Sequence, residues 1–205
     1  MKKENTVYSE KEIQDIYDMG VNYAKGNGTE VSYEKAFEYL KKAADLGHPK
    51  AQYNVGVFYH EGMGVKRDLQ MAFFYFNKSA DQGHDLGLYM VGCYLAEGFK
   101  GEEFVCDGAV FFQQSADMGN TEAQYNLGVC FLTGNGVDLS EKEAIRYFLL
   151  AAEKGHAEAL YKLDICYFHG VGVEASGPEA ISYLEKAADL DHKEAKEMLE
   201  HIRSA

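Results

Sequence analysis

The sequence has 205 residues, 46% of them hydrophobic and 26% charged, a composition typical of a folded globular chain. Its 33 acidic and 20 basic side chains give a net charge of -13 without a clustered basic segment, so nucleic-acid binding is not expected. No stretch approaches the roughly 18 apolar residues of a transmembrane helix, and the start, MKKENTVYSEKEI, lacks the apolar run of a secretory signal. We therefore expect a cytoplasmic protein with no membrane contact.

A step of 36 residues repeats along the chain. The segment AQYNVGVFYHEGMGV at 51–65 returns two steps later as AQYNLGVCFLTGNGV at 123–137. Glycines keep this register at Gly20, Gly56, Gly92 and Gly128, and Asp164 takes the fifth place. A fixed period of this length predicts a solenoid of stacked repeats.

Each repeat contains two segments with the apolar spacing of a helix face. The expected helix pairs are 13–25 and 33–46, 49–61 and 69–82, 85–97 and 106–118, 121–133 and 141–154, and 157–169 and 178–190, followed by a last helix at 193–203. We expect a flexible segment at 1–12 and one repeat domain at 13–205. Its repeats are 13–47, 48–83, 84–119, 120–155 and 156–191, with a C-terminal capping helix at 192–205.

The segments between paired helices carry turn and cap signals. Gly-x-Gly at 26/28, 62/64, 134/136 and 170/172 indicates turns that need positive φ angles. The expected caps of the second helices are Ser32, Asp68, Ser140 and Ser176, and the last two are followed by Glu in the spacing of a capping box. Small residues recur at 36, 72, 108, 144 and 180, where helices are expected to approach closely.

The pattern A-x-x-x-L-G-x-x-Y-x-x-G-x-G-V-x-x-D-x-x-x-A…A-A-x-x-G resembles the Sel-one-like repeat, a relative of the tetratricopeptide repeat. Residues 51–83 match it except at Val55 and Ser79, and the resemblance covers roughly 13–191. The resemblance implies an all-α, right-handed α-solenoid of helix-turn-helix repeats that serves as a protein-binding scaffold without chemistry of its own. The alternative is a small-molecule-binding or hydrolytic protein like the cysteine-rich relatives.

The sequence lacks the motifs of common catalytic sites. There is no phosphate-binding G-x-x-x-x-G-K-[ST], no H-E-x-x-H and no G-x-S-x-G, so we expect no enzyme and no cofactor. The cysteines, Cys93, Cys106, Cys130 and Cys166, do not show the pairing of the cysteine-rich relatives and are expected to be buried free thiols. Histidines recur once per repeat at 48, 84, 156 and 192, a spacing too wide for one metal ion. We expect them in loops near helix C-termini and no metal site.

A tyrosine recurs in every first helix, at Tyr17, Tyr53, Tyr89, Tyr125 and Tyr161. If first helices line the concave face, these rings form a ladder over mildly apolar residues, a combination enriched at interfaces. The alternative is that each ring packs between adjacent first helices. The expected partner-binding residues are Tyr17, Tyr53, Asn54, Val57, His60, Glu61, Tyr89, Cys93, Tyr125, Asn126, Val129 and Tyr161. The expected partner is a peptide or helix of another protein, bound by a monomer, and the acidic net charge favours a basic partner.

Two places break the repeat pattern. In the third repeat, Lys100 stands where glycine is expected and Phe104 where a cap belongs, so we expect that turn to take another path. In the fifth repeat, Asp164 replaces the glycine of the close helix contact. Because an unpaired buried carboxylate is costly, we expect Asp164 to reach water or a basic partner.

Overall fold

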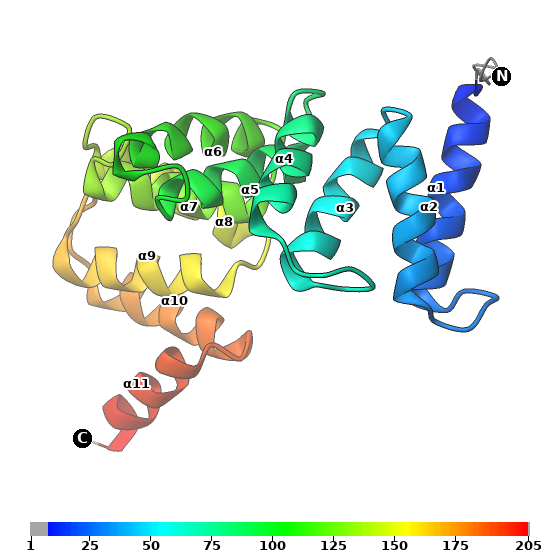
Figure 1. Cartoon of the computed structure of the whole chain (residues 1–205). Helices are drawn as coiled ribbons and strands as arrows, with labels where there is room; N and C mark the ends of the chain where they lie inside the picture. The colour runs from blue at the N-terminus through cyan, green and yellow to red at the C-terminus, as the bar shows by residue number, and fades with distance from the viewer. Residues whose placement is uncertain (1–7, 205) are drawn as a thin grey trace, which may run out of the picture. The chain divides into compact units, whose positions relative to one another are not determined.

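The computed structural model describes residues 8–204, and every regular element in that range is a helix (Figure 1). The helices are α1 (Glu10–Lys25), α2 (Tyr33–Asp45), α3 (Pro49–Glu61), α4 (Leu69–Ala80), α5 (Asp85–Ala96), the 3-10 helix η1 (Glu102–Asp107), α6 (Gly108–Asp117), α7 (Thr121–Thr133), α8 (Glu141–Glu153), α9 (Ala157–His169), α10 (Gly177–Asp189) and α11 (Lys193–Ser204). None of these helices combines the length and apolarity needed to cross a bilayer.

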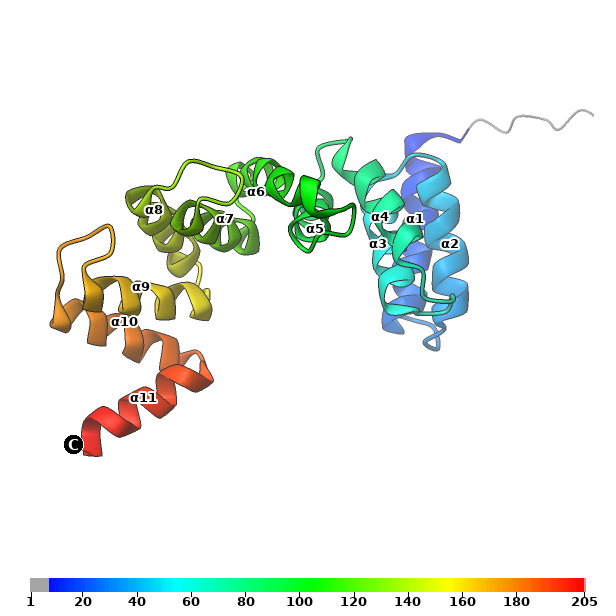
Figure 2. The same ribbon diagram turned by 60° about the vertical axis from the view of Figure 1, so that its left-hand side comes forward.

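The chain divides into two compact units within α5, one up to Val91 and one from Gly92. In the first unit, α1 packs on α2 and α3 on α4. In the second, α7 packs on α8, α9 on α10, and α11 follows against α10 (Figure 2). The predicted fold class, an all-α solenoid of helix-pair repeats, is confirmed.

Within a repeat, the two helices meet where a glycine of the first faces a large side chain of the second. A Cβ atom added to Gly56 would lie 2.6 Å from the Phe76 ring, and one added to Gly128 would lie 2.6 Å from the Phe148 ring. Phe76 and Phe148 are fully buried. The glycine column therefore sets how closely paired helices approach, and the ring fills the space that a side chain would occupy.

The Gly-x-Gly turns serve two different contacts. Gly62 ends α3 in the left-handed conformation with φ 75°, and its N–H donates to the Phe58 carbonyl. Gly64, with φ 62°, lies against the backbone of Tyr33 at the start of α2, so a side chain there would collide with the preceding repeat. The first glycine thus closes a helix, and the second allows neighbouring repeats to pack.

The helix caps agree with the sequence in part. Ser32, Asp68 and Ser140 accept backbone N–H groups as predicted. Ser176 is the N-cap residue of α10 as predicted, but its side chain caps no N–H and instead donates its hydroxyl to the carboxylate of Glu179. A full capping box occurs at Ser9 and Glu12, which is why α1 begins three residues before the predicted residue 13. Residues 1–7 of the predicted flexible segment lie outside the described residues.

The third repeat departs from the others, as expected at its turn. The chain forms η1 before α6 begins at Gly108, two residues after the predicted start at 106. Asp107 precedes α6 without a side-chain cap bond. The small residue at 108 keeps its role, because a Cβ atom there would lie 2.8 Å from the Gly92 carbonyl oxygen. Close helix contact is thus retained although the turn differs.

We expect Gly128→Ala to lower the free energy of unfolding by about 1–3 kcal/mol, because the added methyl group overpacks against Phe148. Gly177→Ala is the matched control: a Cβ atom there would meet nothing within 4 Å. Chemical denaturation of both variants measures the difference. An unchanged or raised stability of Gly128→Ala would show that this column does not limit the helix approach.

Candidate functional site

The recurring histidines begin the first helix of the following repeat. His48 Nδ1 accepts the Ala51 N–H at 3.1 Å, and His156 Nδ1 accepts the Ala159 N–H at 3.1 Å. His192 makes the same bond at the start of α11. The prediction that these residues are loop histidines near helix C-termini missed this role. Because Nδ1 accepts a hydrogen bond, it carries no proton in the capping ring, and the ring proton lies on Nε2.

Each of these capping histidines also stacks on the tyrosine of the preceding first helix. The ring centroids of Tyr17 and His48 lie 4.5 Å apart, and those of Tyr125 and His156 lie 4.7 Å apart. Tyr161 and His192 repeat the arrangement at 4.6 Å. We call this combination of cap and ring stack the Tyr–His joint. It links the first helices of consecutive repeats.

An acceptor from the preceding first helix completes three of the joints. His48 Nε2 lies 3.1 Å from Gln14 Oε1, and His156 Nε2 lies 3.1 Å from Glu122 Oε2. His192 Nε2 is 2.8 Å from Glu158 Oε2. These residues lie three positions before the tyrosine, so one turn of helix supplies both the ring and the acceptor.

No full joint forms at His84, where Lys50 occupies the acceptor position. The Tyr53 and His84 rings are tilted by 48° with centroids 5.5 Å apart, and His84 Nδ1 is buried without a hydrogen-bond partner among the described residues. Burial, helped by the charge of Lys50, lowers the pKa of His84. Burial likewise lowers the pKa of His48. Both rings therefore favour the neutral form in the folded chain.

The predicted partner-binding residues lie on the first helices of the repeats. Glu61 is exposed, and the others are half-buried: Tyr17, Tyr53, Asn54, Val57, His60, Tyr89, Cys93, Tyr125, Asn126, Val129 and Tyr161. Four of the five tyrosine rings lie against the histidine of the next repeat, at Tyr17, Tyr53, Tyr125 and Tyr161, and all five residues are partly exposed. Burial raises the pKa of Tyr125 to about 12, so its hydroxyl stays a neutral hydrogen-bonding group. Their role in binding stays a prediction.

The structure brings some of these residues together around a pocket in the first unit. Asn54 Nδ2 donates to the Tyr17 hydroxyl at 3.4 Å across the first joint. The pocket beside them has a volume of about 270 Å³. Its lining consists of Tyr17, Val21, Ala24, Lys25, Leu40, Asn54 and Phe58. Separately, His60 Nε2 lies 3.7 Å from Glu61 Oε1 at the end of α3.

A larger pocket, of about 480 Å³, occupies the equivalent place four repeat steps later, in the second unit. It lies among α9, α10 and α11, and Ile165, His169 and Leu184 take the places of Val21, Lys25 and Leu40. In both repeats the second helix carries leucine where the three middle repeats carry phenylalanine. The smaller leucine leaves space that a phenylalanine ring would fill, a sequence signal that was not used to predict a pocket.

Asp164 lines this second pocket, a position that the sequence did not predict. The residue is only 5% exposed, and no hydrogen bond or ion pair to another described residue holds its carboxylate. Burial raises the pKa of Asp164, and the nearby His169 opposes this shift. The carboxylate lines an open pocket and forms no ion pair within the described chain, so its contact with water stays a prediction.

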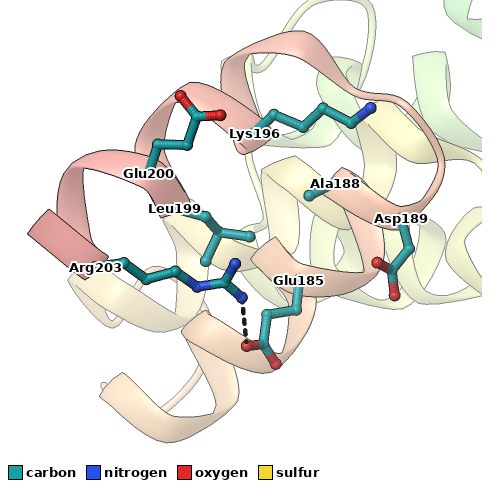
Figure 3. A pocket seen from close by; sticks show the side chains of 7 residues that line it. All are labelled: Glu185, Ala188, Asp189, Lys196, Leu199, Glu200 and Arg203. Atoms are coloured by element: carbon teal, nitrogen blue, oxygen red, sulfur yellow. Dashed lines mark ion pairs between the residues drawn. The ribbon is translucent and has the colours of Figure 1, made fainter.

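A third hollow, between α10 and α11, is lined by charged side chains (Figure 3). Arg203 Nη2 lies 3.6 Å from Glu185 Oε1, and Lys196 pairs with the exposed Asp191. These exposed charges already compensate one another, as surface pairs of small energetic value do. This hollow offers no buried polar group for recognition and is not a candidate site.

The cysteines give no sign of catalysis or metal binding. Cys130 and Cys166 are buried free thiols, and burial raises the pKa of each. Cys106 is also a free thiol but is exposed on η1, so the prediction that it is buried was wrong. Among residues 8–204, no group of three or more His, Cys, Asp or Glu side chains is placed to hold a metal ion.

Removing the cap at His48 should lower stability, and the chain itself suggests the control. We expect His48→Ala to cost about 0.5–2 kcal/mol, because the Ala51 N–H loses its acceptor. His48→Asn should cost less, since Asn120 caps the Ala123 N–H in the same way at the start of α7, at 2.9 Å. Equal losses in unfolding experiments at about pH 8 would contradict a capping role.

The same residue should make stability depend on pH. The pKa of His48 is lowered below 6.5 in the folded chain, so the unfolded chain binds more protons as the pH falls. The contribution of His48 is complete above pH 6.5 and is lost as the pH falls through the folded-state pKa. The stability difference between wild type and His48→Asn should therefore shrink on acidification.

Asp164→Ala should stabilise the chain at neutral pH by about 1–3 kcal/mol, because it removes an unpaired buried carboxylate. Since the pKa of Asp164 is raised, the cost is absent below its ordinary value of 3.8 and complete above the folded-state pKa. The gain should therefore shrink on acidification. Asp15→Ala, at an exposed position of α1, controls for helix propensity. A gain no larger than in this control would contradict the cost.

Comparison with known proteins agrees with this architecture. The family model described as the Sel1 repeat matches residues 14–48, 49–84, 121–156 and 157–192. The third repeat, with its altered turn, lies outside these matches. No curated protein shows significant similarity to the chain.

Several solved structures share the fold. A protective antigen of uropathogenic Escherichia coli with an SLR fold is 28% identical over 94% of this chain and 41% of that one, with a TM-score of 0.85. This chain thus spans less than half of that antigen. A Sel1 repeat protein from Oxalobacter formigenes is 28% identical over 90% and 74% of the two chains, with a TM-score of 0.84. An immunity protein from Pseudomonas aeruginosa is 25% identical over 93% and 70%, with a TM-score of 0.57. With four matched repeats that cover most of its length, the chain belongs to the Sel1 repeat family.

Proposed function

We propose that this chain is a protein-interaction module whose first-helix faces bind an extended or helical segment of a partner protein. The observation that carries the proposal is the row of half-buried tyrosines and small apolar side chains beside the joints. The row includes Val57 and Val129. Two pockets lie beside equivalent positions of the row, one at Val21 in the first unit and one at Ile165 in the second. Half-buried aromatic and apolar groups with polar tips are the composition of interface centres.

The comparisons support binding over catalysis. Sel1 repeat proteins generally act as protein-interaction scaffolds. Three of the similar structures are Pseudomonas aeruginosa proteins, two of them described as immunity proteins, and an immunity role also fits a binding function. The hydrolytic alternative needs a nucleophile beside a base. His169 and His201 line one pocket, but no serine, threonine or cysteine lines either pocket, and the two buried thiols have raised pKa values.

The charge of the chain favours a basic partner segment. With a net charge of -13, the chain attracts cationic surfaces and repels acidic ones. The buried free thiols fit a reducing compartment, so the proposal includes a cytoplasmic location and no cofactor. It also includes a monomeric chain, which leaves the first-helix faces open to another protein.

Affinity purification with the wild-type chain, followed by calorimetry with the recovered partner, tests the proposal. We expect the double variant Tyr53→Phe and Val57→Ala to weaken binding by about 1–2 kcal/mol. The ring of residue 53 is retained, so its contact with His84 and the melting temperature should change little. Phe74→Ala is the control, since Phe74 is an exposed aromatic of the second helix α4. Full affinity in the double variant, with loss in Phe74→Ala, would move binding away from the first-helix face.

A further inference from the structure

The pocket of the fifth repeat combines an apolar wall with one buried acidic group. Asp164, on α9, is only 5% exposed, and it lines the pocket without a hydrogen bond or ion pair to any residue of 8–204. Structures seldom bury a carboxylate in this way, because desolvation without compensation is costly. An unpartnered carboxylate in an open pocket therefore points to a group that arrives from outside the described chain.

The pocket walls are aliphatic and partly open. Ile165, Ile181, Leu184, Met198 and Ile202 line it from three helices. Ile181, Met198 and Ile202 are between 41% and 46% exposed, unusual for aliphatic side chains that share one cavity. These side chains provide contact for an apolar group inserted from solvent.

The remaining charged or titratable groups of the lining are two histidines. His169, at the end of α9, lowers the pKa of Asp164 against the larger effect of burial. His201, on α11, is exposed. Neither histidine forms an ion pair with Asp164 or with another residue of 8–204. Phe168, next to His169, is 66% exposed and offers an aromatic face for a cation at the rim.

The pocket suits the side chain of lysine better than that of arginine. Lysine has an alkyl stem that can lie along aliphatic walls and a single compact ammonium group at its end. One carboxylate can pair with that ammonium group. A guanidinium group would bring five N–H donors into a wall that offers one acidic acceptor, and the unpaired donors would be costly.

We propose that this pocket binds a lysine side chain carried on an apolar segment of a partner protein, with the ammonium group paired to the Asp164 carboxylate. The inference deepens the proposed function and rests on it, because Ile165 belongs to the first-helix row and extends it into the pocket. Charge complementarity supports this occupant, since the buried acid is matched by a cation. The acidic chain as a whole attracts the same partner.

The test uses small probes and the full-length chain, so it does not depend on identifying the partner. The probe is Nα-acetyl-lysine N-methylamide, and the matched probe is the norleucine compound, which lacks only the ammonium group. Methyl NMR signals of Ile165 and Ile181 report occupancy of the pocket. We expect the lysine probe to shift these signals in a saturable manner. The affinity of the norleucine probe should be lower by about tenfold or more.

Asp164→Asn is the decisive variant, because it keeps the side-chain shape and removes the charge. We expect it to remain folded and to lose about tenfold or more in affinity for the lysine probe. Equal binding of both probes, unchanged binding by Asp164→Asn, or no saturable shift up to about 100 mM would overturn the proposal. Binding of free n-pentylamine without binding of the lysine probe would also overturn it, in favour of a small-amine site. The Tyr53 and Val57 test concerns the other unit, so a failure here is distinguishable from a failure of the proposed function.

Discussion

The Tyr–His joint is the contact that links first helices at three of the junctions between consecutive repeats. A histidine caps the first helix of one repeat through Nδ1 and stacks on the tyrosine of the repeat before it, as at His156 and Tyr125. The cap requires a neutral ring, and the stack requires that ring to lie flat against tyrosine. One side chain therefore ends the loop, starts the helix and joins two repeats. Nearest-neighbour contacts of this kind carry the stability of a repeat protein.

The joint also limits what the first-helix face can offer to a partner. The tyrosines are partly used by the stacks, so their exposed edges and hydroxyl groups remain for recognition. Tyr17 shows the combination, because its ring stacks on His48 while its hydroxyl accepts from Asn54. Pockets occur where the second helix carries Leu40 or Leu184 in place of phenylalanine. Recognition is thus expected where the packing of a repeat is relaxed, next to joints that keep the face rigid.

The sequence predicted the features that recur in every repeat and depend on local chemistry. The spacing of Gly56 and Gly128 predicted close helix contacts, and the Ser and Asp caps were mostly correct, because both follow from the backbone needs of a helix. The role of the histidines was missed, since periodicity reveals a column but not which helix its side chains face. Ser176 shows the same limit: its hydroxyl donates to Glu179, and that bond competes with the cap.

The site was less predictable than the fold. The residues of the first-helix row could be named from their period, but the tyrosine contacts depend on how neighbouring repeats pack. Asp164 was recognised as a break in the glycine column, yet its burial depends on α10 and α11 closing around it. That closure involves residues about 20–40 positions further along the chain, a separation at which single-sequence patterns carry little information.

A double-mutant cycle on Tyr125 and His156 tests the central claim most directly. The substitutions are Tyr125→Leu, which removes the aromatic ring, and His156→Asn, which keeps the helix cap in the way that Asn120 does. The account predicts a favourable coupling free energy of about 0.5–1.5 kcal/mol between the two rings in equilibrium unfolding. Additive losses, within about 0.3 kcal/mol, would show that the rings do not stabilise one another and would contradict the Tyr–His joint.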